Sequence, residues 1–477
     1  MCGLILLYGT ESSDRLTACL SRLHHRGPDD QSSWAQCNVA LGFTRLTING
    51  EGAVGRQPYQ YKNLIGAFNG EIYNYGSLIE AHDLAPAHCD TNVILPLFDI
   101  LGPAVINHLD GFYSGVIHQP GTEEVFSFRD HIGKKPLFVG SSEGQTFITS
   151  ELKALDTIDW FELLPLGCAR VNLNTGEVTT LSIHEKKPVT NELFDLLGSS
   201  VRKRIPSPDI PMGIFLSGGL DSSLIAGFTS RFRKDVTYFT LGAVDGPDRQ
   251  AVTQIIKALD LKDVRFVALP DTDELPELLR SVVYATESYN PSIVSNGLAT
   301  YLLAEAARKA GIKVVLTGEG ADELFGGYHY FQKDDQWQAT RNQLIDDMQY
   351  TELRRLDLAC MAHGVEARCP FLDPEIRAFS DKLEFHQIYN NNQNKVTLRH
   401  SFSELIPDNV LYRRKTSCDV GSGIRREIVR YLRRNKRSER DELFEIWKQL
   451  FDRSPHSYFH SYPVFDKAID RRGEIHK

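Results

Sequence analysis

The hydrophobic pattern of this chain changes near residue 190, and that change limits the folds open to it. Beyond this point, apolar runs of strand length alternate with amphipathic runs of helix length, which predicts βαβ units and a parallel sheet. We expect strands at Gly213–Leu216, Val236–Leu241, Val264–Ala268 and Lys313–Thr317. We expect helices at Asn191–Arg204, Ser222–Phe232, Arg249–Leu259, Leu275–Ala285 and Leu298–Ala310.

Before residue 190, short β-type runs are separated by turn residues, and this predicts a sheet-rich, layered domain. The expected strands are Leu4–Tyr8, Val39–Phe43, Leu64–Phe68, Tyr113–Ile117, Val125–Arg129, Leu137–Val139 and Thr146–Thr149. The expected helices are Asp14–Leu23 and Asn92–Leu101. We predict a linker at His184–Thr190, domains at 2–185 and 190–424, and a helical tail at 425–477. The run Arg425–Arg440 in that tail is interpreted as a solvated helix face.

Length and charge exclude several classes of protein. A chain of 477 residues is too long for one compact core, which favours two domains. The net charge of −9 gives no electrostatic reason to expect a nucleic-acid or membrane partner. No apolar stretch is long enough to span a bilayer, and the N-terminus lacks the pattern of a secretory signal. With eight scattered cysteines that form no CxxC pair, we expect reduced thiols and a cytoplasmic protein.

The strongest chemical signal is the string Ser-Gly-Gly-Leu-Asp-Ser-Ser at 217–223, which joins an apolar strand to an amphipathic helix. Gly218 and Gly219 let backbone N–H groups approach an anion, and Ser217 and Ser222 add hydroxyl donors. The carboxylate of Asp221 would repel bare phosphates, so its presence suggests a bound Mg²⁺. The string lacks the Gly-Lys-Ser/Thr ending of a Walker A loop. It resembles the PP-loop of ATP pyrophosphatases, which implies adenylation of a substrate.

A second acidic, glycine-rich string, Gly318–Tyr328, follows another predicted strand. In a parallel sheet this string would lie at the carboxyl edge, where ligands bind. Asp322 can supply a second Mg²⁺ carboxylate, and Glu319 can accept a proton from attacking ammonia. Alternatively, one or more of these acids caps a helix, above all Glu323. Further along the chain, Lys415 can stabilise the transition state and the leaving pyrophosphate.

The N-terminal region carries a different chemistry. Cys2 becomes an N-terminal nucleophile once Met1 is removed, because the free α-amino group then serves as its base. Asn69 and Gly70 can donate N–H groups to a tetrahedral oxyanion, although this pair alone is also typical of a type I′ hairpin turn. Arg45 can clamp a substrate carboxylate, and Asp90 can bind an ammonium group.

Taken in order, these motifs resemble a known family. Cys2, His25–Asp29, Asn69–Asn74 and Arg129–Gly133 are similar to the motifs of class II glutamine amidotransferases. With Ser217–Ser223, Gly318–Tyr328 and Gly364–Asp373 added, the set resembles glutamine-hydrolysing asparagine synthetases. The resemblance implies an α/β and α+β chain with two domains: an N-terminal nucleophile αββα sandwich followed by a parallel-sheet PP-loop domain. It further implies an AMP-forming ligase with an internal ammonia tunnel.

The resemblance also assigns roles to residues. It places catalysis on Cys2, Asn69, Gly70, Glu319 and Lys415. It places glutamine binding on Arg45, Leu46, Thr47, Ile48, Asn49, Asn69, Gly70, Glu71 and Asp90. It places ATP contacts on Phe215, Ser217, Gly218, Gly219, Asp221, Ser222, Leu241, Thr317 and Gly318, and Mg²⁺ on Asp221 and Asp322. A homodimer is a possible oligomeric state.

The acceptor of the ammonia is the least determined part of the reaction. Aspartate is the leading candidate, with glutamine and ATP as co-substrates and asparagine, glutamate, AMP and pyrophosphate as products. The segment Glu287–Asn296 lacks the arginine-containing stretch associated with asparagine synthetases. An amidotransferase acting on another carboxylate, such as a specialised metabolite, a peptide or a sugar acid, is therefore an alternative. A non-catalytic regulatory paralogue is a second alternative, disfavoured because Cys2, Asp221, Glu319 and Asp322 are all present.

Overall fold

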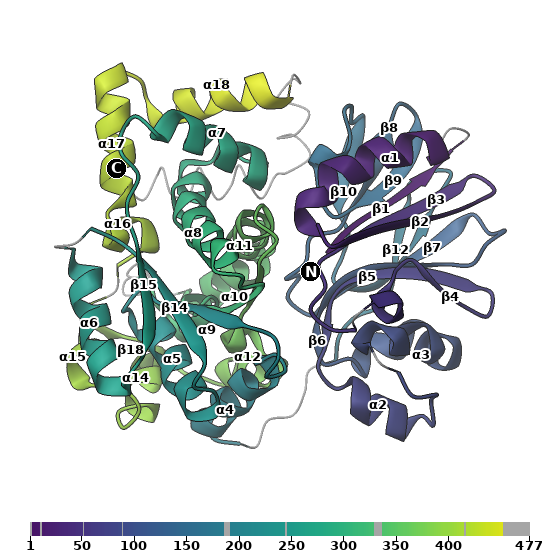
Figure 1. Ribbon diagram of the computed structural model, residues 1–477. Helices are drawn as coiled ribbons and strands as arrows, with labels where there is room; N and C mark the ends of the chain where they lie inside the picture. The colour runs from purple at the N-terminus through teal and green to yellow at the C-terminus, as the bar shows by residue number, and fades with distance from the viewer. Residues whose placement is uncertain are drawn as a thin grey trace. The chain divides into compact units, whose positions relative to one another are not determined.

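The chain forms two compact units, which Figure 1 shows coloured from the N-terminus to the C-terminus. The computed structural model describes residues 2–9, 12–50, 52–87, 89–185, 191–243, 246–328, 336–414 and 416–451. The first unit comprises Met1–Glu185, Gln349–Asp357 and Lys448–Lys477, and the second comprises Lys186–Met348 and Leu358–Trp447. Lys415 lies outside the described residues, so its predicted role has no structural counterpart here.

Two antiparallel sheets make up most of the first unit. One sheet has the order β10 (Trp160–Leu163), β8 (Phe138–Ser142), β9 (Gln145–Thr149), β1 (Cys2–Tyr8), β3 (Val39–Arg45) and β2 (Asp30–Gln36). The other has the order β12 (Val178–Ser182), β11 (Gly167–Asn172), β7 (Glu124–Arg129), β6 (Gly111–His118), β5 (Leu64–Ile72) and β4 (Tyr59–Tyr61).

The packing of these sheets produces four layers. Alternate residues of the two sheets, among them Leu6 and Phe43 on one and Ile65 and Val116 on the other, share an apolar core between them. The outer face of the first sheet is covered by α1 (Ser12–Leu23), whose buried residues recur at helical spacing. The outer face of the second is covered by α2 (Tyr75–Ala81) and α3 (Ile94–Leu101). The predicted αββα sandwich is confirmed.

The second unit is built around a five-stranded parallel sheet, also as predicted. Its order is β15 (Asp263–Val267), β14 (Val236–Leu241), β13 (Met212–Phe215), β16 (Val314–Leu316) and β17 (Glu366–Arg368). The chain runs from β13 outward to β14 and β15, then returns to the other side of β13 with β16. The strand order therefore reverses between β13 and β16, and in open α/β sheets ligands bind at the carboxyl ends beside such a reversal.

Helices connect and cover this sheet. Five of them were expected from the sequence: α4 (Leu193–Arg204), α5 (Leu220–Phe232), α6 (Pro247–Leu259), α7 (Leu275–Thr286) and α8 (Pro291–Lys309). The predicted start of α8 at Leu298 is wrong. The helix begins at Pro291 because the Asn290 side chain accepts hydrogen bonds from the backbone N–H groups of Ser292 and Ile293, and proline suits the first helical position.

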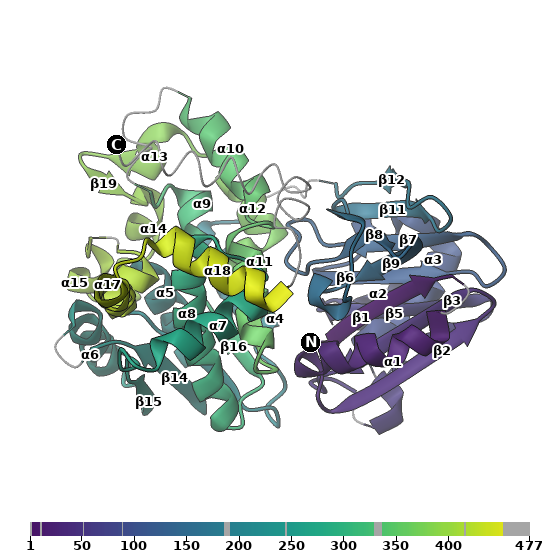
Figure 2. The ribbon, with the colours of Figure 1, turned by 90° about the horizontal axis from the view of Figure 1, so that it is seen from above.

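The remaining elements of the second unit follow β16. The helices are α9 (Ala321–Phe325), α10 (Trp337–Asp347), α11 (Glu352–Met361, which starts in the first unit), α12 (Pro374–Ser380), α13 (Phe385–Ile388), α14 (Val396–Ser401), α15 (Asp408–Leu411), α16 (Cys418–Ser422), α17 (Ile424–Asn435) and α18 (Glu439–Phe451, which ends in the first unit). The short strands β18 (Tyr389–Asn390) and β19 (Gln393–Asn394) form a hairpin. Figure 2 shows α18 beside α7, and the Tyr289 ring that follows α7 contacts the rings of Phe444 and Trp447.

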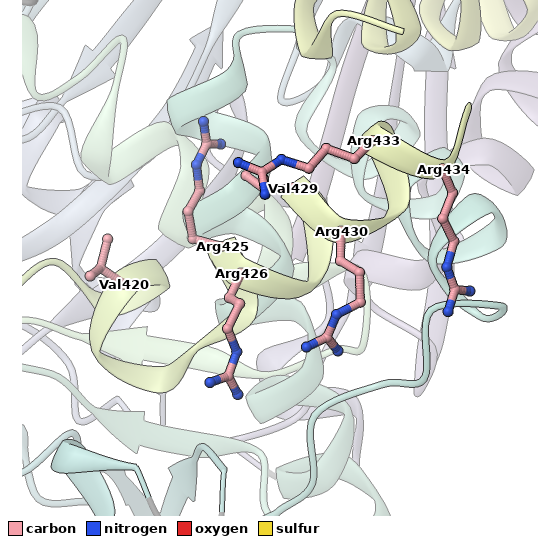
Figure 3. A pocket seen from close by; sticks show the side chains of 7 residues that line it. All are labelled: Val420, Arg425, Arg426, Val429, Arg430, Arg433 and Arg434. Carbon is pink, nitrogen blue, oxygen red and sulfur yellow. The ribbon is translucent and has the colours of Figure 1, made fainter. Parts of the chain in front are cut away.

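The arginine-rich helix α17 has two different faces. Ile424, Ile428 and Leu432 are buried, whereas the arginine side chains extend from the helix as Figure 3 shows. A cavity of about 760 Å³ on this surface is lined by Val420, Arg425, Arg426, Val429, Arg430, Arg433 and Arg434. Arg425 pairs with Glu439, and Arg430 pairs with Glu427. The prediction of a solvated helix face is confirmed for these arginines.

Two further observations concern the whole described chain. None of the helices in the described ranges combines the length and the apolar character that a bilayer crossing requires. All eight cysteines lie in the described part of the chain, and none of them forms a disulfide there.

Candidate functional site

The predicted nucleophile lies at the start of a central strand of the first unit. Cys2 opens β1, and its side chain is buried. Its backbone nitrogen donates a hydrogen bond to Oδ1 of Asn69, at 2.9 Å. Asn69 belongs to β5 in the other sheet, so this contact joins the two sheets at Cys2.

Asn69 carries an unsatisfied hydrogen-bond donor at this point. Its side chain is fully buried, and its Nδ2 has no hydrogen-bond partner among the described residues. A buried donor without a partner costs free energy of about 1–3 kcal/mol, so such groups in folded proteins commonly have a functional explanation. The amide therefore presents its oxygen to the nitrogen of Cys2 and retains an N–H group for another acceptor.

Gly70 has the conformation and the surroundings that require glycine. Its φ is +151°, and a Cβ atom there would lie 2.0 Å from the carbonyl oxygen of Phe112. Asn69 and Gly70 pair with Ser114 and Tyr113 of β6 within continuous strands. The alternative of a type I′ hairpin turn at these two residues is therefore wrong.

The predicted glutamine-binding residues gather around the loop that follows β3. The Arg45 guanidinium donates to the backbone carbonyls of Asn49, Gly50 and Gly52 and so holds this loop. The Asn49 side chain donates to Glu71 on β5 at 2.5 Å.

The other predicted glutamine-binding residues continue this network. Asp90 accepts a hydrogen bond from the backbone N–H of Ile72, next to Glu71, at 2.8 Å. The backbone N–H of Thr47 donates to Asp29 at 2.7 Å. Leu46 and Ile48 are buried. The structure thus brings Arg45–Asn49, Glu71 and Asp90 into one hydrogen-bonded region connected to Asn69 through β5.

A buried group of charges lies directly behind Cys2. Arg26 is fully buried and donates to the carbonyl oxygen of Cys2 at 2.9 Å. Its guanidinium also pairs with Glu151 at 2.5 Å and with Asp357 at 2.8 Å. Lys135 pairs with the other oxygen of Asp357 at 2.5 Å. The segment Gln349–Asp357, remote in sequence, is thereby joined to the rest of the first unit through Arg26, which also contacts Cys2.

Electrostatics keep both carboxylates of this group ionised. Burial acts to raise the pKa of Asp357, but the Arg26 and Lys135 cations outweigh it and lower that pKa to about 2. Burial likewise acts to raise the pKa of Glu151, and Lys153, His25 and Arg26 together lower it well below its ordinary value. A depressed carboxyl pKa favours the folded state above the pKa of the unfolded chain. The stabilisation from Asp357 is therefore present above about pH 4 and is lost as the pH falls towards 2.

We predict that Asp357→Asn lowers the free energy of unfolding of the first unit by about 3–5 kcal/mol at pH 7, because two buried cations lose their shared carboxylate. The variant should also lose less stability than the wild type between pH 4 and pH 2. Calorimetric unfolding of the full chain across this range measures both effects. Asp156→Asn is the matched control, because Asp156 pairs with Arg22 at the surface with its side chain 74% exposed. Equal stability of wild type and Asp357→Asn at pH 7 would contradict the prediction.

In the second unit, the predicted phosphate cradle lies between β13 and α5. The Ser217 and Ser222 hydroxyls are 3.0 Å apart, and the N–H of Gly219 donates to the Ser217 hydroxyl at 3.3 Å. Gly218 has φ +70°, and a Cβ there would lie 2.8 Å from the backbone nitrogen of Val252. Hydrogen bonds of the Ser217 and Ser222 hydroxyls thus hold the turn together, and there is no room for a side chain at Gly218.

The acidic string Gly318–Tyr328 begins in close contact with the turn that precedes α5. A Cβ on Gly318 would lie 2.8 Å from both the Asp221 Cβ and the Ser222 nitrogen, so only glycine permits this approach. Phe215 and Leu241 end the neighbouring strands β13 and β14, and Thr317 follows β16. The predicted ATP-binding residues therefore surround the carboxyl end of β13.

The acids that follow β16 lie in and before the short helix α9. Glu319 occupies the turn before α9, and Asp322 lies in its first turn. Glu323 is buried and accepts a hydrogen bond from the Tyr328 hydroxyl. No side chain caps α9 at its start, so the capping alternative for Glu323 is not observed.

Asp221 and Asp322 lie on either side of one ammonium group. Lys395 places its Nζ 2.6 Å from each carboxylate oxygen of Asp221 and 2.5 Å from Oδ1 of Asp322. Two carboxylates that share one cation are close enough to share another. Within the described ranges, no group of three or more His, Cys, Asp or Glu residues has the geometry of a metal site. Two carboxylates suffice for Mg²⁺, which usually retains waters and binds substrate phosphates.

Sequence reasoning missed two residues of these sites, Lys395 and Asp357. Neither belongs to a glycine-rich string or follows a recognisable strand. Arg26 gave one indirect indication of Asp357, because an arginine that is buried needs a carboxylate partner. However, nothing in the sequence shows which carboxylate that partner is.

Comparison with known proteins assigns the family. Residues 1–163 match the family model described as glutamine amidotransferase domain, and residues 192–346 and 339–460 match the one described as asparagine synthase. The chain belongs to the asparagine synthase family. It is a glutamine-dependent amidotransferase.

Members of the asparagine synthase family from distant organisms are similar over most of the chain. Asparagine synthetase B [glutamine-hydrolyzing] of Escherichia coli K12 is 31% identical over 443 residues, which cover 85% of this chain and 78% of that protein. A probable asparagine synthetase of Acanthamoeba polyphaga mimivirus is 28% identical, covering 87% of this chain and 84% of that protein. Among solved structures, a glutamine phosphoribosylpyrophosphate amidotransferase from B. subtilis is 16% identical with a TM-score of 0.34, covering 66% of this chain and 81% of that one.

Proposed function

We propose that this chain releases ammonia from glutamine at Cys2 and transfers it to the carboxylate of aspartate, which ATP has first adenylated. The products are asparagine, glutamate, AMP and pyrophosphate. Residues 2–185 form the glutaminase domain and 190–424 the ATP-binding synthetase domain, followed by a tail at 425–477. The observation that carries this proposal is the Asn69 amide, whose oxygen accepts a hydrogen bond from the Cys2 nitrogen and whose buried Nδ2 has no hydrogen-bond partner among the described residues.

Glutamine hydrolysis begins at Cys2. After removal of Met1, the α-amino group of Cys2 accepts the thiol proton, and the thiolate attacks the side-chain amide carbon of glutamine. Asn69 orients the amine through Oδ1, while its Nδ2 and the Gly70 N–H group stabilise the oxyanion. Arg45–Asn49, Glu71 and Asp90 bind the rest of the glutamine molecule, with carboxylates for its ammonium group and an arginine for its carboxylate.

We predict that Asn69→Ala lowers the turnover number of glutamine hydrolysis by about 10²–10³-fold, the usual effect of removing one oxyanion donor. Synthesis driven by added ammonium should be unchanged, because it bypasses this site. Steady-state assays of glutamate release and of AMP formation measure the two reactions. Asn174→Ala is the matched control, because the side chain of this asparagine accepts a hydrogen bond from the Tyr8 hydroxyl at an exposed position. Hydrolysis at the wild-type rate in Asn69→Ala would remove Asn69 from the oxyanion site.

Adenylation takes place at the carboxyl end of β13. Ser217, Gly218, Gly219 and Ser222 hold the β and γ phosphates, and Phe215, Leu241, Thr317 and Gly318 contact the rest of ATP. The carboxylates of Asp221 and Asp322 would hold Mg²⁺, which supplies neutralisation of the phosphate charge. Glu319 accepts the proton that ammonia loses on attacking the acyl adenylate. Lys415 adds positive charge for the leaving pyrophosphate.

Aspartate is the proposed acceptor because the relatives matched over most of the chain are named asparagine synthetases. One observation favours a different carboxylate as the second candidate. The acceptor segment Glu287–Asn296 contains no cation for a second carboxylate. Within it Tyr289 packs on Phe444 and Trp447, and Asn290 caps α8.

Acceptor-dependent AMP release, measured with ammonium and a panel of carboxylates, tests the proposal. The panel should contain aspartate, glutamate, sugar acids and peptides with free C-termini. Aspartate is expected to give the largest kcat/KM. Release of AMP with another carboxylate but not with aspartate would replace the acceptor and leave the mechanism standing.

A further inference from the structure

Lys395 is a buried lysine, unlike the solvent-exposed lysines of a protein surface. Its side chain is 2% exposed, less than the 14% and 17% of the Asp221 and Asp322 side chains that it contacts. Ordering and burying a lysine costs rotamer entropy and desolvation of the ammonium group. The contacts of the Lys395 ammonium with both oxygens of Asp221 and with Oδ1 of Asp322 offset this free-energy cost. They require the ammonium to stay in one fixed position.

The backbone around Lys395 is built to hold it there. Lys395 follows the β18–β19 hairpin and has a left-handed conformation with φ +54°, which is uncommon for a residue other than glycine. The preceding Asn394 donates its side-chain N–H to the carbonyl of Gly327 at 2.8 Å. Arg399 in turn binds the side-chain oxygen of Asn394 at 2.8 Å and its carbonyl oxygen at 2.7 Å.

Gly327 completes this arrangement from the acidic string. A Cβ at this position would lie 1.8 Å from Oδ1 of Asp322 and 2.7 Å from Cε of Lys395. Glycine is therefore required for the lysine and the aspartate to meet. The β18–β19 hairpin and Gly327 in the acidic string therefore both position the contact between Lys395 and Asp322.

The charges of Lys395, Asp221 and Asp322 indicate the function of this contact. Two carboxylates that share a partly buried site repel each other, and the Lys395 ammonium between them carries one positive charge against their two negative charges. A divalent cation would neutralise both. The ammonium and a metal ion held by Asp221 and Asp322 would need the same oxygen atoms, so they compete for one position.

We propose that Lys395 closes the metal position of Asp221 and Asp322 in the free enzyme and leaves it only when nucleotide binds. The triphosphate adds negative charge to the cradle and attracts the ammonium, so the carboxylates become available to the cation that accompanies ATP. Lys395 thereby couples metal binding to nucleotide binding and prevents the site from capturing a metal without its substrate. This inference rests on the proposed nucleotide site.

Binding of Mn²⁺ to the full chain, followed by the electron paramagnetic resonance signal of the free ion, tests this coupling without turnover. Without nucleotide, the wild type should bind Mn²⁺ weakly, and addition of α,β-methylene-ATP should tighten binding by about tenfold or more. Lys395→Met should bind Mn²⁺ about tenfold more tightly than the wild type in the absence of nucleotide. Lys309→Met is the matched control, since Lys309 is 71% exposed and pairs with Glu305 on its own helix; it should behave like the wild type.

Two results would overturn the proposal: tight Mn²⁺ binding by the wild type without nucleotide, or no tightening in Lys395→Met. The wild-type comparison with and without nucleotide decides the question even if Lys395→Met does not fold. Adding Asp322→Asn to Lys395→Met should abolish the gained binding, and retained binding would place the ion elsewhere and reject the proposal. Failure of the proposed function would show as absent AMP release with every acceptor, which is independent of these titrations.

Discussion

Cys2→Ala is expected to abolish glutamine hydrolysis while synthesis from added ammonium continues at the wild-type rate. Alanine leaves no nucleophile for the amide carbon, and no other thiol lies in this hydrogen-bonded region except Cys89, whose pKa is raised to about 12 by burial and by Asp90. A thiol with so high a pKa is hardly ionised at neutral pH and is a poor nucleophile. We expect a loss of at least about 10⁴-fold in glutamate release, in line with the removal of other covalent nucleophiles.

Two assays on one preparation measure this effect: glutamate release with glutamine, and AMP formation with ammonium. Cys19→Ala is the matched control, because Cys19 is also a buried thiol of the first unit but lies on α1. It should retain both activities. Glutaminase activity in Cys2→Ala would show that the nucleophile had been wrongly assigned.

The second large effect is expected from Asp221→Ala, which should stop ATP–pyrophosphate exchange and leave glutamine hydrolysis intact. In the proposed mechanism, the metal ion would lose one of its two acidic ligands, and the leaving pyrophosphate would lose charge neutralisation. The loss should be about 4 kcal/mol of transition-state stabilisation, or about 10³-fold in exchange rate.

Asp195→Ala provides the comparison for this variant, because Asp195 is an exposed aspartate in the first turn of α4 in the same unit. Exchange in Asp195→Ala should equal that of the wild type. If Asp221→Ala exchanged pyrophosphate at a near-normal rate, Asp221 would not be a ligand in the nucleotide site.

Most of the fold could be predicted where periodicity is strong. The alternation after residue 190 located the first four strands of the parallel sheet, and the apolar runs before it located β1, β3 and β5–β9. The edge strand β2 (Asp30–Gln36) was missed because its residues are largely polar and exposed, so it has no apolar pattern to detect. The start of α8 was misplaced because its first turn is capped by Asn290 instead of being marked by apolar spacing.

The candidate sites were predictable only where one short string contains the chemistry. Ser217–Ser223 carries its own glycines, hydroxyls and acid, and the structure places them together. Lys395 and Asp357 act through contacts with residues that are between 73 and 331 positions away, and no local pattern encodes such a distance. The unpaired N–H of Asn69 depends equally on the packing of two sheets, which the sequence does not show.

In the proposed mechanism, the cradle of Ser217–Ser223 holds the β and γ phosphates as a unit, so that the carboxylate attacks the α phosphorus. Phosphorus NMR of a single-turnover mixture with ATP, aspartate and ammonium tests this most directly. We predict that AMP and pyrophosphate appear together in equal amounts. Accumulation of ADP and inorganic phosphate would contradict the adenylation mechanism, because it would place the attack on the γ phosphorus instead.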